Sequence, residues 1–253
     1  MNERIKVNNA CVDFDLLLDL ALQIEPLARE FGATYFEFLT ALSFLAFKKL
    51  KVEYAILEVG MGGEFDATNV VEPILSVLTS ISFDHTEHLG KTIEEITKTK
   101  MAIIRKIGII GKNSPNVINL IKQSSNADLY FVDEIYLNRA KQFDLNFLKC
   151  DYEKENLACA FLAIDCLNKY YNLGLDAQAI KNTYWPARFE IIQSANKTFK
   201  DDMKFENKNY KFLEDANTSL LYAQQSNYEN IFIAGSLYLA ALAKACILEE
   251  NLP

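Results

Sequence analysis

Residues 107–133, IGIIGKNSPNVINLIKQSSNADLYFVD, contain the pattern that decides the fold. The apolar run at 107–111 has the length and composition of a buried strand. Ser114 followed by Pro115 is a typical helix start, with the serine as cap and the proline in the first turn. A second apolar run at 127–133 predicts another strand. A strand, a helix and a strand in this order indicate a parallel pair joined by a crossover helix.

The rest of the chain repeats this alternation. Apolar runs at 52–60 (VEYAILEVG), 72–81 (EPILSVLTSI) and 230–236 (NIFIAGS) predict further strands. Two helix starts have capping-box form, Thr34 with Glu37 and Thr92 with Glu95. The helices predicted in addition to the one after Ser114 cover 15–31, 34 to about 50, 91–106, 153–171, 176–183, 213–225 and 237–248. The expected fold class is therefore α/β, a mostly parallel sheet with helices on both faces.

Composition limits the class of protein. Half of the 253 residues are hydrophobic, enough for a sizeable core, and the net charge of −8 argues against a nucleic-acid-binding surface. The five cysteines are scattered without a C-x-x-C pair, which is typical of free thiols in a reducing cytoplasm. The N-terminal segment has no apolar signal core, and the longest apolar run is too short to cross a membrane. We expect a cytoplasmic protein.

A domain boundary is expected near Pro186. Residues 1–186 would form the main domain, and residues 187–253 would be a smaller second part. About 65 residues are few for an independent domain. We therefore expect this second part to have no sheet of its own.

Glycines and polar side chains gather after two of the predicted strands. The stretch EVGMGGEFDATN (58–69) holds three of the chain's nine glycines, and DHTEH (84–88) holds both of its histidines. In parallel sheets, ligands bind beyond the carboxyl ends of the strands. A carboxylate such as Glu58 with the imidazole of His85 could hold Mg²⁺, which keeps waters and substrate phosphates, or Mn²⁺. A plain polar loop after a strand is the alternative.

The sequence LGKT (89–92) ends like a phosphate-binding loop. The full pattern requires a glycine five residues before Gly90, and that position is His85. We interpret Gly90-Lys91-Thr92 as a turn followed by a helix cap.

Taken together, several motifs resemble the folylpolyglutamate synthase/dihydrofolate synthase family of Mur-type ATP-dependent ligases. The motifs, in the family's order, are MNERIKVN, TYFEFLTALSFLAF, EVGMGGEFDATNVVEP, LTSISFDHTEHLGKTIEEITKTKMAIIRK, EKENLACAFLAID, WPARFEII and IFIAGSLYLAA. The resemblance implies a Mur ligase central domain. It also implies a reaction in which a pteroate or folate carboxylate takes the γ-phosphate of ATP and the amine of L-glutamate then displaces phosphate.

The resemblance also implies roles for particular residues. Glu58 and His85 would bind Mg²⁺ or Mn²⁺. Lys100 would be carbamylated and, with His85, would act in catalysis.

Four further residues would contact substrates. Asn156 and Arg188 would bind ATP, and Asp66 with Ala67 would bind on the pterin side. Position 187 is alanine where the family usually has glycine, so the match at Arg188 is less complete.

Two family features are not found in these 253 residues, the G-T-N-G-K-G-S phosphate loop with its first βα unit and the middle of the C-terminal domain. We therefore expect residues 187–253 to be a remnant of that domain. We also expect little or no ligase activity from this chain alone, and a monomer that can self-associate through an exposed sheet edge. Two alternatives stay open: a non-catalytic remnant or binding module, and a Mur-type ligase acting on a peptidoglycan precursor.

Overall fold

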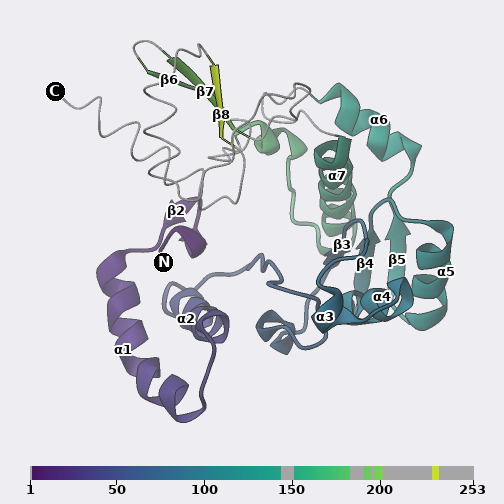
Figure 1. Ribbon diagram of the computed structural model, residues 1–253. Helices are drawn as coiled ribbons and strands as arrows, with labels where there is room; N and C mark the ends of the chain where they lie inside the picture. The colour runs from purple at the N-terminus through teal and green to yellow at the C-terminus, as the bar shows by residue number, and fades with distance from the viewer. Residues whose placement is uncertain (1, 144–150, 183–190, 195–196, 202–229, 234–253) are drawn as a thin grey trace. The chain divides into compact units, whose positions relative to one another are not determined.

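The parallel sheet predicted around residues 107–133 is present in the computed structural model (Figure 1). Its strands are β3 (Ser76–Leu78), β4 (Ile107–Ile110) and β5 (Asp128–Phe131), in the order β3-β4-β5 with every pair parallel. The four residues of β4 are all buried. This central strand therefore fixes the register of both neighbours.

The structure describes residues 2–143, 151–182, 191–194, 197–201 and 230–233. The chain divides into two compact units, Met1–Tyr136 with Ala158–Asn172, and Leu137–Leu157 with Leu173–Pro253. The boundary expected near Pro186 lies outside the described residues.

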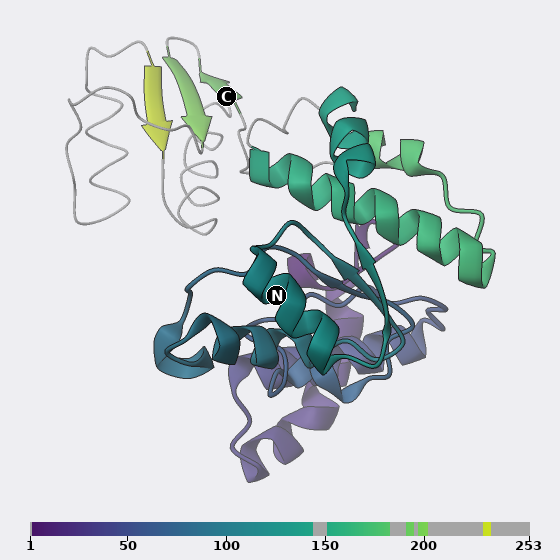
Figure 2. The same cartoon turned by 90° about the vertical axis from the view of Figure 1, so that its right-hand side faces the viewer.

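Helices cover both faces of the sheet, which confirms the predicted α/β class. On one face, Ile107 and Ile109 pack against Cys159, Leu162, Ala163 and Cys166 of α7 (Asp151–Tyr171). On the other face, Ile110 and Leu78 pack against Met101 of α4 (Ile93–Met101) and against Val117 and Ile121 of α5 (Pro115–Ser124). Figure 2 shows α5 and α7 as separate layers.

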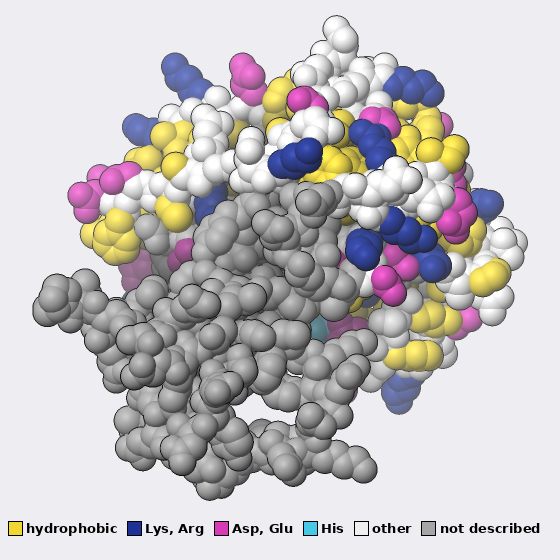
Figure 3. Space-filling model, turned by 90° about the horizontal axis from the view of Figure 1, so that it is seen from above, with side chains coloured by type: hydrophobic (Ala, Val, Ile, Leu, Met, Phe, Trp, Pro, Cys, Tyr) yellow, Lys and Arg dark blue, Asp and Glu magenta, His cyan; other side chains and the backbone are white. Residues whose placement is uncertain are grey.

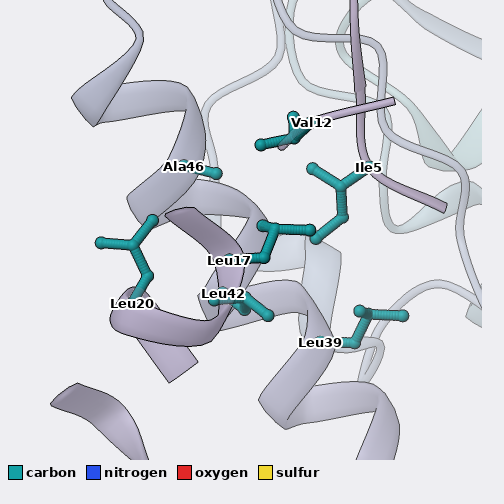
Figure 4. Close-up of a cluster of buried hydrophobic side chains, with 7 residues drawn as sticks. All are labelled: Ile5, Val12, Leu17, Leu20, Leu39, Leu42 and Ala46. Atoms are coloured by element: carbon teal, nitrogen blue, oxygen red, sulfur yellow. The ribbon is translucent and has the colours of Figure 1, made fainter. Parts of the chain in front are cut away.

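The N-terminal part of the first unit has its own apolar cluster (Figure 4). Helices α1 (Phe14–Glu30) and α2 (Tyr35–Lys49) enclose it, and the short elements η1 (Asn2–Arg4), β1 (Lys6–Val7) and β2 (Ala10–Cys11) border it. Its buried members are Ile5, Val12, Leu17, Leu20, Leu39, Leu42 and Ala46. The β1–β2 hairpin was not predicted, although Asn8 and Asn9 both have positive φ (51° and 64°), as a two-residue hairpin turn requires.

The predicted helix caps are confirmed. The Thr34 hydroxyl accepts from the backbone N–H of Glu37, and the Glu37 carboxylate accepts from the backbone N–H of Thr34 at 2.7 Å. The hydrogen bond from that N–H lowers the pKa of the Glu37 carboxyl below its ordinary value. Thr92 with Glu95 forms the same capping box at the start of α4, and Ser114 caps α5.

One predicted strand is wrong. Residues 52–59 contain no strand, and Tyr54 and Ile56 are 59% and 99% exposed. Strand β3 is at the edge of its sheet, and within the described part of the chain nothing pairs with this segment. An apolar run forms a strand only where a neighbouring strand supplies hydrogen bonds.

Other differences concern short elements. Helix α6 (Glu134–Gln142) was missed, although Asp133 accepts from the N–H groups of Ile135 and Tyr136 at its start. The helix predicted at 176–183 is a 3₁₀-helix, η3 (Ala177–Asn182). The helices predicted at 213–225 and 237–248 lie outside the described residues. In the described part, no helix is long and apolar enough to span a membrane.

The second unit contains a sheet, contrary to our expectation. Strands β6 (Ile191–Ser194) and β7 (Lys197–Asp201) form an antiparallel hairpin, and β7 pairs in parallel with β8 (Asn230–Ile233). Strand β8 was predicted, whereas β7 lies in a polar stretch with little periodicity. Pairing with β6 in the hairpin, rather than a local apolar pattern, therefore determines that β7 forms a strand.

The burial of Ile109 in the central sheet leads to a testable prediction about the free energy of unfolding. Ile109 is fully buried between the sheet and α7, so Ile109→Ala should lower the free energy of unfolding by about 2–5 kcal/mol. Ile135, which is 73% exposed on α6, is the matched control, and Ile135→Ala should change it by less than about 0.5 kcal/mol. Urea titration measures both variants, and equal losses would contradict the assigned core.

Candidate functional site

The carboxylate of Asp66 organises residues 58–69, which we call the glycine loop. Its Oδ2 accepts from the backbone N–H groups of Gly60 (2.9 Å) and Met61 (3.0 Å). Its Oδ1 accepts from the backbone N–H (2.9 Å) and the hydroxyl (2.5 Å) of Thr68. One side chain thus holds the two arms of the loop together and caps η2 (Ala67–Val70).

The glycines let this loop lie directly on two helices. Gly62 has φ +72°, and a β-carbon there would lie 2.7 Å from Cδ2 of Leu89 in α3 (Thr86–Leu89). A β-carbon on Gly63 would lie 2.7 Å from the carbonyl oxygen of Thr99 and 2.8 Å from that of Lys100, both in α4. Any larger residue at position 63 would therefore push the loop away from the helix backbone.

Polar contacts fasten the loop to α4 as well. The N–H of Glu64 donates to the Thr99 carbonyl at 2.9 Å. Asn69 donates to the Glu64 carbonyl and accepts from Arg105, whose guanidinium also donates to the Ala102 carbonyl at the end of α4. The pairing of Asn69 with Arg105 was not predicted, because a contact over 36 residues leaves no local pattern.

His85 begins α3 in the left-handed conformation, with φ 46° and ψ 43°. Its carbonyl accepts from the N–H groups of His88 and Leu89, and its Nε2 lies 3.6 Å from Oδ1 of Asp84. The imidazole is exposed, whereas Leu89 is buried beneath Gly62. Helix α3 is therefore attached to the glycine loop through Leu89.

These contacts bring together the elements that carry Glu58, His85 and Lys100. Glu58 is exposed at the start of the glycine loop, and Lys100 is half-buried on α4, where its own carbonyl contacts Gly63. Ala67 is half-buried at the first position of η2.

The two residues expected to bind ATP are placed differently. Asn156 is exposed on α7, in the second unit. Arg188 lies outside the described residues.

Few side chains in the described ranges are placed to bind a metal ion. Across the described ranges, no three His, Cys, Asp or Glu side chains form a group that could hold a metal ion. Glu58 and His85 could supply two ligands and leave the other positions to water and phosphate oxygens. Such a set fits Mg²⁺ or Mn²⁺ only in the presence of a phosphate-bearing substrate.

The Gly90-Lys91-Thr92 segment is a turn and a helix cap, as predicted. The Glu95 carboxylate accepts from the N–H groups of Lys91 (2.7 Å) and Thr92 (3.2 Å). A phosphate group bound at a helix start would need these same N–H groups. The chain's own carboxylate occupies them instead.

On the face shown in Figure 3, charges of both signs are mixed with apolar side chains.

The network around Asp66 predicts a second stability test. Asp66→Asn should destabilise the chain by about 1.5–3 kcal/mol, because an amide –NH₂ would face N–H donors that now meet a carboxylate. Asp19→Asn is the matched control, since Asp19 is exposed on α1. Urea titration provides the measurement, and an Asp66→Asn variant as stable as Asp19→Asn would refute the organising role.

Comparison with curated proteins gives relatives with consistent descriptions. The chain is 35% identical over 214 residues to a probable dihydrofolate synthetase of Schizosaccharomyces pombe, covering 75% of this chain and 51% of that protein. It is 34% identical over 226 residues to a dihydrofolate synthase/folylpolyglutamate synthase of Bacillus subtilis, covering 76% and 53%. The chain thus spans about half the length of the curated relatives it matches.

Solved structures share the fold. The apo form of L. casei FPGS superimposes with a TM-score of 0.77 at 22% identity, covering 98% of this chain and 80% of that chain. A folylpolyglutamate synthase from Thermotoga maritima gives a TM-score of 0.73 at 19% identity, covering 100% and 80%.

The family model described as the Mur ligase middle domain matches residues 22–163, which include the glycine loop, α3, α4 and the whole parallel sheet. This match covers more than half of the 253 residues. The chain belongs to the Mur ligase middle domain family.

Proposed function

We propose that this chain is built as an ATP-dependent ligase that joins L-glutamate to dihydropteroate or a folate. The curated relatives are named as dihydrofolate synthases and folylpolyglutamate synthases. Structural neighbours of the same fold include an FPGS–AMPPCP complex and an FPGS–AMPPCP–folate complex. These names support a ligase that uses ATP and a folate-type substrate.

The observation that carries the proposal is the seating of the glycine loop on α3 and α4. Gly62 contacts Leu89, and Gly63 contacts the backbone of Thr99 and Lys100. Three elements that each carry a predicted site residue therefore pack on one another, although they are up to 42 residues apart in the sequence.

In the proposed reaction, a carboxylate oxygen of the pterin substrate attacks the γ-phosphorus of ATP, and ADP leaves. The glutamate nitrogen then attacks the acyl carbon, loses a proton, and displaces inorganic phosphate. The protein contributes mainly by orienting the reactants. Asn156 and Arg188 would contact ATP, and Asp66 and Ala67 would shape the pterin side.

Glu58 and His85 would hold Mg²⁺ or Mn²⁺ together with phosphate oxygens. When bound, the cation neutralises charge on the transferred phosphoryl group. Lys100 is half-buried on α4, and as a carbamate it would present a carboxylate-like group to this site.

The substrate class is tested by thermal shift of the 253-residue chain with dihydropteroate, with folate, and with a UDP-muramyl precursor. A pteridine ligand at 100 times its Kd should add roughly 2.7 kcal/mol of stability, whereas the muramyl nucleotide should add none. Stabilisation by the muramyl nucleotide alone would favour a peptidoglycan ligase. Stabilisation by none of the three ligands would contradict the proposed substrate class.

The metal ligands are tested with Glu58→Gln. In the presence of the ATP analogue AMPPCP, the variant should weaken Mn²⁺ binding at least roughly tenfold, as measured by electron paramagnetic resonance. Glu53→Gln is the matched control, because Glu53 is exposed five residues earlier. Equal Mn²⁺ affinity in the two variants would remove Glu58 from the site.

A further inference from the structure

Within the described part of the chain, the segment that carries His85 is anchored at its two ends. All seven side chains from Ser82 to His88 are exposed, so burial fixes none of them. The segment is anchored at Leu89, which is buried beneath Gly62, and at Ile81, which is half-buried against the sheet cluster. The position of His85 therefore depends on these two anchors.

Asn113 makes the anchor at Ile81. Its Oδ1 accepts from the N–H of Ile81 at 2.7 Å, and its Nδ2 donates to the carbonyls of Thr79 and Gly111, each at 3.0 Å. Thr79 directly follows β3, and Gly111 directly follows β4. One amide group thus joins the ends of two parallel strands where the chain turns toward His85.

An amide is the group that this place requires, because it must donate to two carbonyl oxygens and accept from one N–H. A carboxylate could still accept from Ile81, but its second oxygen would face two carbonyl oxygens. The space is also confined, since a β-carbon on Gly111 would lie 3.2 Å from Cα of Thr79.

We propose that Asn113 is a positioning residue for His85, which it places through the backbone of 79–81. Asn113 itself need not touch a substrate. The consequence for metal binding rests on the proposed function, whereas the placement of His85 does not.

The test uses the two histidines as local probes, because His85 and His88 are the only ones in the chain. In metal-free protein, Asn113→Asp should shift the imidazole ¹H–¹⁵N signals of His85, and His88→Asn assigns the two side chains. Asn116→Asp is the matched control, since Asn116 is exposed three residues further along, on α5. Unchanged His85 signals in a folded Asn113→Asp variant would overturn the proposal. If that variant does not fold, Asn113→Ser, which cannot satisfy all three partners, replaces it under the same criterion.

A second measurement separates this proposal from the metal site. With Mn²⁺ and AMPPCP, the wild-type His85 signal should broaden, and Asn113→Asp should require at least about ten times more Mn²⁺ for the same effect. If wild-type His85 does not broaden, the metal role of His85 fails, and the metal-free spectra still decide the role of Asn113. Equal Mn²⁺ dependence in Asn113→Asp and Asn116→Asp would overturn the positioning of a metal ligand.

Discussion

The candidate site depends on one close approach, that of the Gly63 backbone to the carbonyls of Thr99 and Lys100. A β-carbon would lie 2.7 Å from the first of these oxygens, which is closer than real side chains come. Because no side chain stands between them, the N–H of the next residue can donate to the Thr99 carbonyl. This contact sets the distance between the glycine loop and α4. The neighbouring contact of Gly62 with Leu89 attaches α3 to the same loop. The spacing of the elements that carry Glu58, His85 and Lys100 depends on it.

Polar side chains then maintain the shape of this region. Asp66 accepts from both arms of the glycine loop, Asn69 and Arg105 close it onto α4, and Asn113 joins the ends of β3 and β4. Each does so by satisfying backbone groups that no regular element satisfies at these positions. The exposed side chains of Glu58 and His85 are therefore carried on a backbone whose geometry other residues fix.

Much of the fold could be predicted because its signals are local. Capping boxes at Thr34 and Thr92, the cap at Ser114 and the apolar runs of β3, β4 and β5 each lie within a few residues. The strand expected at 52–60 does not form, since no described strand pairs with this segment. The prediction was wrong because an apolar pattern gives no information about whether a partner strand exists. Helix α6 and strand β7 were missed because their local apolar patterns are weak. The Asp133 cap defines the start of α6, and pairing with β6 defines β7. Among the site residues, the sequence identified side chains in dense motifs, but it did not reveal the Asn69–Arg105 contact or the role of Asn113.

The sequence by itself determined the α/β class, the family and the glycine-rich and histidine-rich motifs, because residue type and short-range spacing encode them. Only the tertiary structure decided that the Asp66 carboxylate is used by the loop's own N–H groups, that Glu95 occupies the start of α4, and that Asn113 holds the strand ends. These are pairings of one donor with one acceptor, in part between residues more than thirty positions apart. Such pairings depend on packing that brings the two groups within hydrogen-bonding distance, and no local pattern of the chain records them.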